Sequence, residues 1–384
     1  MDWSDYEVDG QLIMFDIAND EEFECFKPKK STDWKWSFSD YPKEKNGLKV
    51  FSCFACGGGS TMGYKLCGCE VLGCCEIDPK MNEVYIKNHN PKYNFLMDIR
   101  EFNNTPNDEL PEELFDLDIL DGSPPCTTFS MAGEREESWG KKKKFREGQA
   151  EQTLDDLSFV FIETVNKLRP KTVIMENVEG LLLGNAWSYV QEIYKQFKDI
   201  GYKLNHWLLK GETMGVPQKR HRVFFVAIRE DLNIDPTSLD MSFNYEPITY
   251  SQIYDGKGRK CDVDSKTYKL LCECRDEEND LGAAHLRLYG SECFFQNKIL
   301  KQNEVVMTIR AKSNDFWSKE NKAGMSCGEI ISSQTFPQDY DFETFTLSNI
   351  TYICGMSVPP LMIKRLVTKL IEQGVYDYRL KQEN

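Results

Sequence analysis

The 384-residue sequence lacks the long apolar segment that marks membrane proteins. None of its apolar runs approaches the ~20 residues that a membrane helix needs. Its acidic N-terminus, MDWSDYEVDGQLIMFD, is unlike a signal peptide. We therefore expect a cytoplasmic protein that does not enter a membrane. In that compartment its 14 cysteines should be reduced thiols, most of them small buried side chains.

The sequence also has little that would bind a metal. Cys53 and Cys56 form its one CxxC pair, no second pair completes a zinc site, and the chain holds only four histidines. We expect no metal cofactor.

Positive charge is scarce as well. The net charge of −15 argues against a general nucleic-acid binder, because phosphate contacts need lysine and arginine. One dense basic run, KKKKFR at 141–146, stands out from this background. It favours either a local phosphate-binding segment or a solvated basic loop.

From residue 48 onward, buried strands alternate with helical segments. We expect strands at 48–55, 70–78, 114–121, 171–177 and 222–229, and helices from residue 61 and at 80–88, 152–169, 187–200 and 361–373. This alternation predicts an α/β fold with a doubly wound, mostly parallel sheet. Residues 231 to about 305 break the pattern, look irregular, and suggest a smaller inserted domain.

The glycine-rich stretch FACGGGSTMG (54–63) follows an expected strand and opens a helix. Glycines allow a ligand to approach the backbone there, and a helix N-terminus favours an anionic group. Glu76 and Asp78 end the next strand, at the position where a carboxylate commonly binds ribose. The loop alone could be a simple turn, but the loop and the acids together favour a nucleoside-containing cofactor.

Three further motifs carry candidate catalytic groups. In DGSPPCTTFS (121–130), two prolines fix the backbone before Cys126 at a strand end, which suits a nucleophilic thiol, although a buried turn cysteine fits too. Glu176 in MENVEGLL ends a neighbouring buried strand and could give or hold a proton, or form a salt bridge. Arg220 and Arg222 in QKRHR face the same way on an extended backbone. They could bind a phosphate or an exocyclic oxygen, or pair with surface acids.

Taken in order, these motifs resemble those of the C5-cytosine DNA methyltransferases, from about residue 48 to 373. MDIREF (97–102), EIISSQTFPQDYDF (329–342) and GMSVPP (355–360) fit further motifs of that family. The resemblance implies a Rossmann-like, S-adenosylmethionine-dependent fold. It divides the chain into an N-terminal extension (1–47), a catalytic and cofactor-binding domain (48–230), a target-recognition domain (231–325) and a C-terminal part that returns to the catalytic domain (326–384).

The resemblance also implies a mechanism. The Cys126 thiolate adds to C6 of a flipped-out cytosine, Glu176 hydrogen-bonds or protonates the ring at N3, and C5 takes the methyl group from S-adenosylmethionine. Arg222 contacts the O2 edge of the base, and Arg220 and Gln218 organise that wall. The expected cofactor contacts are Phe54, Gly57, Gly58, Gly59, Glu76, Ile77, Asp98, Ile99, Pro124, Leu157, Ser357 and Val358. The expected DNA contacts are Lys141, Lys142, Lys143, Lys144, Arg146 and Gln218.

The expected partners are double-stranded DNA and, in function rather than in contact, a cognate restriction endonuclease; we expect a monomer. Two alternatives stay open on the sequence: a tRNA cytosine-C5 methyltransferase, and a non-catalytic DNA-binding relative. Several positions depart from the family pattern: Cys56 stands where glycine is usual, Ser52 where aspartate is common, Thr127 where glutamine is common, and Met356 where asparagine is usual.

Overall fold

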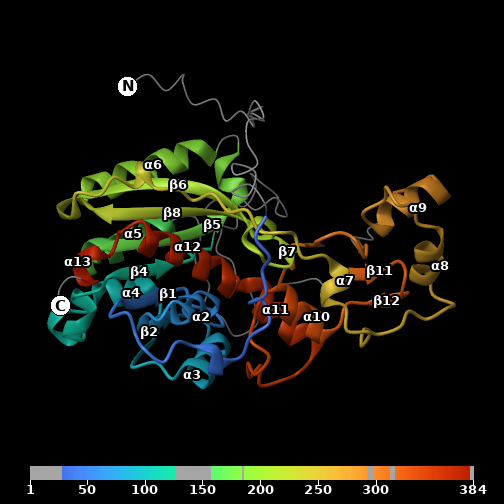
Figure 1. The fold of residues 1–384 in the computed structure, drawn as a ribbon, viewed down its shortest axis with the longest axis horizontal. Coiled ribbons are helices and arrows are strands. Elements are labelled where there is room, and N and C mark those ends of the chain that lie inside the picture. Colours follow the sequence, from blue (N-terminus) through green and yellow to red (C-terminus); the bar gives the residue numbers. More distant parts are fainter. Residues whose placement is uncertain (1–27, 126–156, 184–185, 293–296, 312–315, 381–384) are drawn as a thin grey trace, which may run out of the picture.

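A seven-stranded sheet forms the centre of the molecule (Figure 1). The computed structural model describes residues 28–125, 157–183, 186–292, 297–311 and 316–380. The strand order is β3-β2-β1-β4-β5-β8-β6, with β3 to β5 mutually parallel and β8 antiparallel to both of its neighbours. The strands are β1 (Lys49–Cys53), β2 (Glu70–Glu76), β3 (Tyr93–Leu96), β4 (Ile119–Gly122), β5 (Thr172–Val178), β6 (Tyr202–Lys210) and β8 (His221–Arg229). The predicted doubly wound, mostly parallel sheet is confirmed.

Two hydrophobic cores lie on opposite faces of this sheet. In β8, Phe224, Val226 and Ile228 belong to one core, and Val223, Phe225 and Ala227 to the other. Helices α4 (Ile99–Asn104), α5 (Leu157–Leu168) and α6 (Trp187–Asp199) supply the second core. Helices α2 (Gly59–Leu66), α3 (Pro79–His89) and α12 (Pro360–Glu372) supply the first. Burial on both faces explains why the strand sequences are apolar throughout rather than alternating.

The sheet has its topological switch point between the parallel strands β1 and β4. The chain runs outward from β1 through β2 and β3 on one side, and from β4 through β5 on the other. Open α/β sheets bind their ligands at such a switch point, outside the carboxyl ends of the strands. The glycine-rich loop follows β1 and the Pro-Pro segment follows β4, so both sequence motifs meet there.

A smaller lobe, orange in Figure 1, projects from this body. Helices α8 (Lys266–Glu273) and α9 (Leu281–Tyr289) pack on a three-stranded sheet of β9 (Lys298–Leu300), β11 (Phe316–Ser318) and β12 (Ala323–Gly324). The expected inserted lobe is present, but the expectation that residues 231 to about 305 are irregular was wrong. The two helices begin at side-chain caps, Ser265 and Asp280, and each spans only about two turns, which is too short for a repeated apolar spacing to stand out.

One segment that precedes the lobe in sequence, and one that lies between two of its strands, pack on the body. Helix α7 (Tyr250–Ile253) and strand β10 (Val306–Met307), which pairs with β7 (Gln218–Lys219), contribute to the first core of the central sheet. After the lobe, α10 (Cys327–Ser333), α11 (Leu347–Met356) and α12 return to the body, and α13 (Asp377–Leu380) follows.

Residues 29–41 form a segment that we call the N-terminal strap, drawn in blue in Figure 1. Lys29 pairs with Tyr245 in a parallel bridge, next to the start of the lobe insertion. The Trp36 indole donates a hydrogen bond to the Thr335 carbonyl at 2.8 Å, and Asp33 forms ion pairs with Lys364 and Arg365 of α12. The strap therefore holds together body segments that precede and follow the lobe in the sequence.

Within the described ranges, no helix combines the length and the apolar character required to cross a bilayer.

Candidate active site

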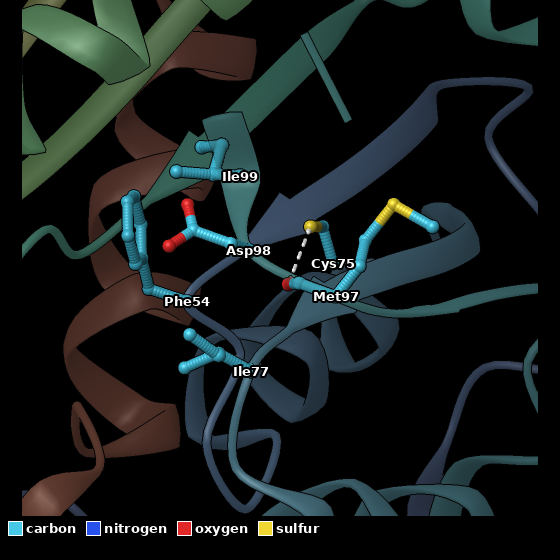
Figure 2. Close-up of a pocket in the computed structure, with 6 residues that line it drawn as sticks. All are labelled: Phe54, Cys75, Ile77, Met97, Asp98 and Ile99. Atoms are coloured by element: carbon cyan, nitrogen blue, oxygen red, sulfur yellow. Dashed lines mark hydrogen bonds between the residues drawn. The ribbon is translucent and has the colours of Figure 1, made fainter. Parts of the chain in front are cut away.

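A small pocket lies at the ends of β1, β2 and β3 (Figure 2). Phe54, Ile77, Asp98 and Ile99, all predicted to contact the cofactor, line it together. No sequence motif indicated its other two lining residues, Cys75 of β2 and Met97 directly after β3. The Phe54 ring and the Ile77 side chain offer apolar faces to a flat ring, and the nearby Asp98 carboxylate offers an acceptor. This combination suits a nucleoside.

The loop that follows β1 has a left-handed backbone at alternate residues. Phe54, Cys56 and Gly58 have φ values of 56°, 47° and 80°. A Cβ on Gly58 would lie 2.0 Å from His89 Nε2, and one on Gly59 would lie 2.1 Å from the Val358 carbonyl oxygen. Gly58 is therefore required by backbone conformation and by close packing, and Gly59 by close packing alone.

Two side chains distant in sequence hold the Gly57 carbonyl. The Tyr340 hydroxyl donates to it at 2.6 Å, and His89 Nε2 lies 3.2 Å from it. Burial lowers the pKa of His89 to about 3, so the ring is neutral. Neither residue was predicted from the sequence, because each reaches the loop only through the tertiary fold. Ser357 and Val358, which were predicted, pack directly against this loop.

Glu76 ties the loop to the end of β2. Its carboxylate accepts backbone N–H bonds from Cys56 at 2.8 Å and from Ile77 and Asp78 at 2.9 Å. Burial raises the pKa of Glu76, and these bonds oppose the rise. A carboxylate has about four acceptor positions, so capacity is left for a ligand hydroxyl.

Asp98 caps helix α4 by accepting a bond from the Arg100 amide at 2.8 Å, which fixes its carboxylate at the pocket. Leu157 lies one turn before Phe161 on α5, and the Phe161 ring packs against Phe54 with centroids 6.3 Å apart. Leu157 itself is buried in the core behind the pocket and does not line it.

The candidate catalytic groups lie on the other side of the switch point. Glu176 near the end of β5 forms an ion pair with Arg222 of β8, with 2.8 Å between Oε1 and Nε. Both side chains are largely buried. The amide of Asn177 donates to the Pro124 carbonyl at 3.4 Å, which joins the Glu-Asn-Val strand to the Pro-Pro segment. The structure thus brings Glu176, Arg222 and Pro124 together.

Arg220 is buried beside them. Its guanidinium donates to the Gly355 carbonyl at 3.3 Å and to the Ile309 carbonyl at 3.4 Å, while its Nε has no hydrogen-bond partner among the described residues. Burial and the neighbouring Arg222 lower the pKa of Arg220 to about 9. Arg220 therefore connects the site to the segment between β10 and β11 and to the end of α11.

Gln218 differs from its prediction as a DNA-contacting residue. Its side chain is fully buried. The amide nitrogen donates to Gln334 at 2.8 Å, and the amide oxygen accepts from the Ile309 backbone at 3.0 Å. Burial and satisfied hydrogen bonds leave no free polar atom for DNA, so this residue holds the wall together from inside.

Other predicted site residues lie outside the described residues: Cys126, Lys141, Lys142, Lys143, Lys144 and Arg146. The described part of the chain contains no cluster of three or more His, Cys, Asp or Glu side chains arranged for a metal ion. Six of the eleven cysteines in that part are buried, and all eleven are free thiols.

The fold and the site indicate a general class of protein, an α/β enzyme that binds a nucleoside-containing cofactor at the switch point of its sheet, beside a buried carboxylate–arginine pair. Residues 48–372 match the family model described as C-5 cytosine-specific DNA methylase, and the chain belongs to this family. It is accordingly a DNA (cytosine-5)-methyltransferase that uses S-adenosylmethionine, and DNA is its substrate.

Similar proteins include bacterial and phage enzymes. The type II methyltransferase M.FnuDI of Fusobacterium nucleatum is 34% identical over 361 residues, which cover 88% of this chain and 98% of the relative. The orphan methyltransferase M.SPRI of Bacillus phage SPR is 29% identical over 60% of this chain and 47% of its own length.

Solved structures show the same fold at low identity. A mutant of DNMT2 from Spodoptera frugiperda superposes with a TM-score of 0.59 at 17% identity, covering 85% of this chain and all of that one. The methyltransferase EhMeth of Entamoeba histolytica gives 0.57 at 14% identity, with 86% and 99% coverage.

Proposed function

We propose that Cys126, Glu176 and Arg222 carry the reaction of this methyltransferase. The observation that supports this most is the buried Glu176–Arg222 pair, 2.8 Å apart, joined through Asn177 to the Pro124 carbonyl two residues before Cys126. A nucleophile, a proton-handling carboxyl and a cationic wall then face one space at the carboxyl edge of the sheet.

In this proposal the Cys126 thiolate attacks C6 of the cytosine, and the ring electrons move toward C5 and N3. Glu176 hydrogen-bonds or protonates N3 and so relieves the developing charge. Arg222 holds Glu176 in place and binds the O2 edge of the base. S-adenosylmethionine would supply the methyl group to C5 and leave as S-adenosylhomocysteine. Loss of the C5 proton to solvent would then restore the C5–C6 double bond and expel Cys126 as a thiolate.

The cofactor would lie in the pocket of Phe54, Ile77, Asp98 and Ile99, with its ribose toward Glu76. The loop of Gly57, Gly58 and Gly59, backed by Ser357 and Val358, would hold its amino-acid end. Pro124 would lie between the cofactor and the base, and Leu157 would support the pocket from behind.

The remaining roles concern DNA and cellular context. We assign phosphate contacts to Lys141, Lys142, Lys143, Lys144 and Arg146, because five cations in one segment offset an acidic surface locally. Base reading belongs to the lobe within residues 231–325, between the catalytic parts 48–230 and 326–384, with residues 1–47 as an extension. We further propose a cytoplasmic monomer that works alongside a cognate restriction endonuclease.

Covalent trapping tests the catalytic assignment. Wild-type protein with S-adenosylmethionine should form a denaturation-resistant complex with duplex DNA containing 5-fluorocytosine, because the missing C5 proton blocks release. Cys126→Ser should form no complex and yet bind the cofactor as tightly as wild type. Trapping by Cys126→Ser would refute the assignment of Cys126 as the nucleophile. Trapping on tRNA instead of DNA would refute the proposal that the site accepts a cytosine of DNA.

A further inference from the structure

Asp121 occupies a joint of three elements at the switch point of the sheet. It lies on β4 directly opposite Ser52 of β1 in the parallel register. Its Oδ2 accepts a hydrogen bond from the Ser52 hydroxyl at 2.6 Å, and its Oδ1 accepts one from the Tyr64 hydroxyl of α2 at 3.0 Å. All three side chains are almost completely buried. The Ser60 side chain, also on α2, interacts with the same carboxylate.

Each element of this joint leads directly into one half of the active site. Ser52 lies two residues before Phe54, where the cofactor loop begins, and Tyr64 lies on the helix into which that loop continues. Asp121 lies three residues before Pro124, on the strand that leads to Cys126. The cofactor-binding half and the nucleophile-bearing half are therefore linked at Asp121, before they diverge.

The chemistry of the contacts suits a permanent joint. Buried carboxylates usually pair with cations or backbone N–H groups, whereas the contacts of Asp121 described above are hydroxyls. A hydroxyl can donate or accept, so the contacts survive whether the carboxyl is ionised or neutral. Burial, with a smaller contribution from the charge of Glu176, raises the pKa of Asp121 to about 7 against the lowering effect of its hydroxyl hydrogen bonds. Cys53 and Tyr85 are the other titratable groups that interact with it from β1 and α3.

We propose that Asp121 is a positioning residue for methyl transfer, which sets the strand that carries the nucleophile against the loop that holds the methyl donor. This rests on the proposed function, in which Cys126 holds the cytosine while its C5 meets the methyl group. Both partners must be placed within a narrow range, because a shift of about 1 Å can cost roughly a hundredfold in rate.

Tyr64→Phe is the sharpest test, because it deletes one hydroxyl and leaves the ring that fills the core. Tyr85→Phe is the matched control. Tyr85 is equally buried, and its hydroxyl also bonds to α2, at 2.9 Å from Thr61 Oγ1, but it does not hydrogen-bond to Asp121. Ser52→Ala and Asp121→Asn complete the set by removing the other donor and the acceptor.

Three quantities should be measured for every variant: kcat, the Kd for S-adenosylmethionine, and the rate of trapping on 5-fluorocytosine DNA. We expect Tyr64→Phe, Ser52→Ala and Asp121→Asn to lower kcat by about tenfold or more, with cofactor Kd within about threefold of wild type. Tyr85→Phe should keep kcat within about threefold. The double variant Tyr64→Phe/Asp121→Asn should be no slower than the slower single variant, because both changes break the same joint.

Equal kcat in Tyr64→Phe and Tyr85→Phe would overturn the proposal. So would a loss confined to cofactor Kd, since the joint would then shape the cofactor loop alone. Thermal unfolding shows which variants fold. If Asp121→Asn does not fold, the kcat values of Tyr64→Phe and Ser52→Ala test the proposal without it. Failure of the wild type to trap DNA would refute the proposed mechanism instead, so the two failures are distinguishable.

Discussion

The cofactor loop concentrates conformational strain in two residues that have side chains. Phe54 and Cys56 both have positive φ values, a conformation that costs a non-glycine residue roughly 1–2 kcal/mol. In this conformation the Cys56 amide donates a hydrogen bond to the Glu76 carboxylate at 2.8 Å, which offsets part of the strain. Glycine, usual at this position in the family, would adopt it without that cost.

Gly58→Ala should abolish cofactor binding. The new methyl group would lie 2.0 Å from His89 Nε2, in addition to the left-handed backbone strain, so we expect a loss of about 2 kcal/mol or more in unfolding free energy. Calorimetric titration with S-adenosylmethionine and urea unfolding would measure both effects.

Gly290→Ala is the control for that change. Gly290 has a similar φ of 69°, but nothing lies within 4 Å of the added Cβ. It should lose only the backbone part, about 1 kcal/mol, and keep cofactor affinity. Similar losses in the two variants would show that packing against His89 is unimportant.

Asp121 should make the stability of the protein fall with rising pH. Its pKa is about 7 in the folded protein against 3.8 as the ordinary value, so between these values the folded state keeps a proton that the unfolded state has lost. This contribution is present below about pH 4 and is lost as pH rises through about 7. Urea unfolding at pH 5 and pH 8 should show that wild type loses more stability than Asp121→Asn over this interval. An equal change in both proteins would contradict the assignment.

At the scale of elements, the N-terminal strap stabilises the fold through the ion pairs of Asp33 with Lys364 and Arg365 of α12. Burial would raise the pKa of Asp33, but Arg365 and Lys364 outweigh it and lower that pKa to about 2. The ion pairs therefore persist above the ordinary pKa and weaken only as pH falls toward 2.

Asp33→Asn should lower the unfolding free energy at pH 7 by about 1 kcal/mol and make the strap more sensitive to protease. Asp240→Asn is a suitable comparison, because Asp240 pairs with Lys369 of the same helix but is far more exposed. A larger loss in Asp240→Asn than in Asp33→Asn would show that the strap is not held by this cluster. Differential scanning fluorimetry and limited proteolysis would measure the two effects.

The elements that sequence patterns predicted well are those with one dominant period. Apolar spacing placed α6 and α12 within a residue or two, and continuous apolar runs placed β1, β5 and β8. Strand β6 was missed, since this edge strand mixes buried Tyr202 and Leu209 with exposed lysines and has no clean period. Sequence periodicity also did not show that β8 runs antiparallel to β5. That direction depends on how the chain returns to the sheet through β6, which no local pattern reveals.

The same limit applies to the site. Glu176 and most pocket residues lie at or just after the carboxyl ends of parallel strands, so strand prediction brought them to one edge. Arg222 lies at the start of β8 and reaches the same edge only because β8 is antiparallel to β5. Tyr340 and His89 reach Gly57 across long sequence separations, and no local pattern marks such contacts. Gln218 was misjudged because a motif position does not reveal whether a side chain points outward or, as here, into the protein.

The whole molecule combines two large hydrophobic cores, one on each face of the central sheet, with a small core in the lobe. The smaller lobe has six buried residues in its own cluster, whereas the two sheet cores are several times larger. Local stability follows buried apolar contact, so the lobe should open more readily than the body.

Hydrogen exchange followed by mass spectrometry should show this difference. Peptides from α8 and α9 should exchange well before those from β1, β5 and β8, and added S-adenosylmethionine should slow exchange in the β1 loop and leave α8 and α9 unchanged. Simultaneous exchange of lobe and body would indicate a single cooperative unit instead.

The packing of α12 beneath the cofactor loop has a consequence for biosynthesis. Gly63 of α2 fits closely against Pro360 and Ile363, and Gly59 against Val358, about 300 residues later in the chain. A nascent polypeptide that has not yet extended past α12 has a cofactor loop without its floor. We therefore expect a chain that stops before α12 to lack a stable cofactor loop, and so to lack methylating activity.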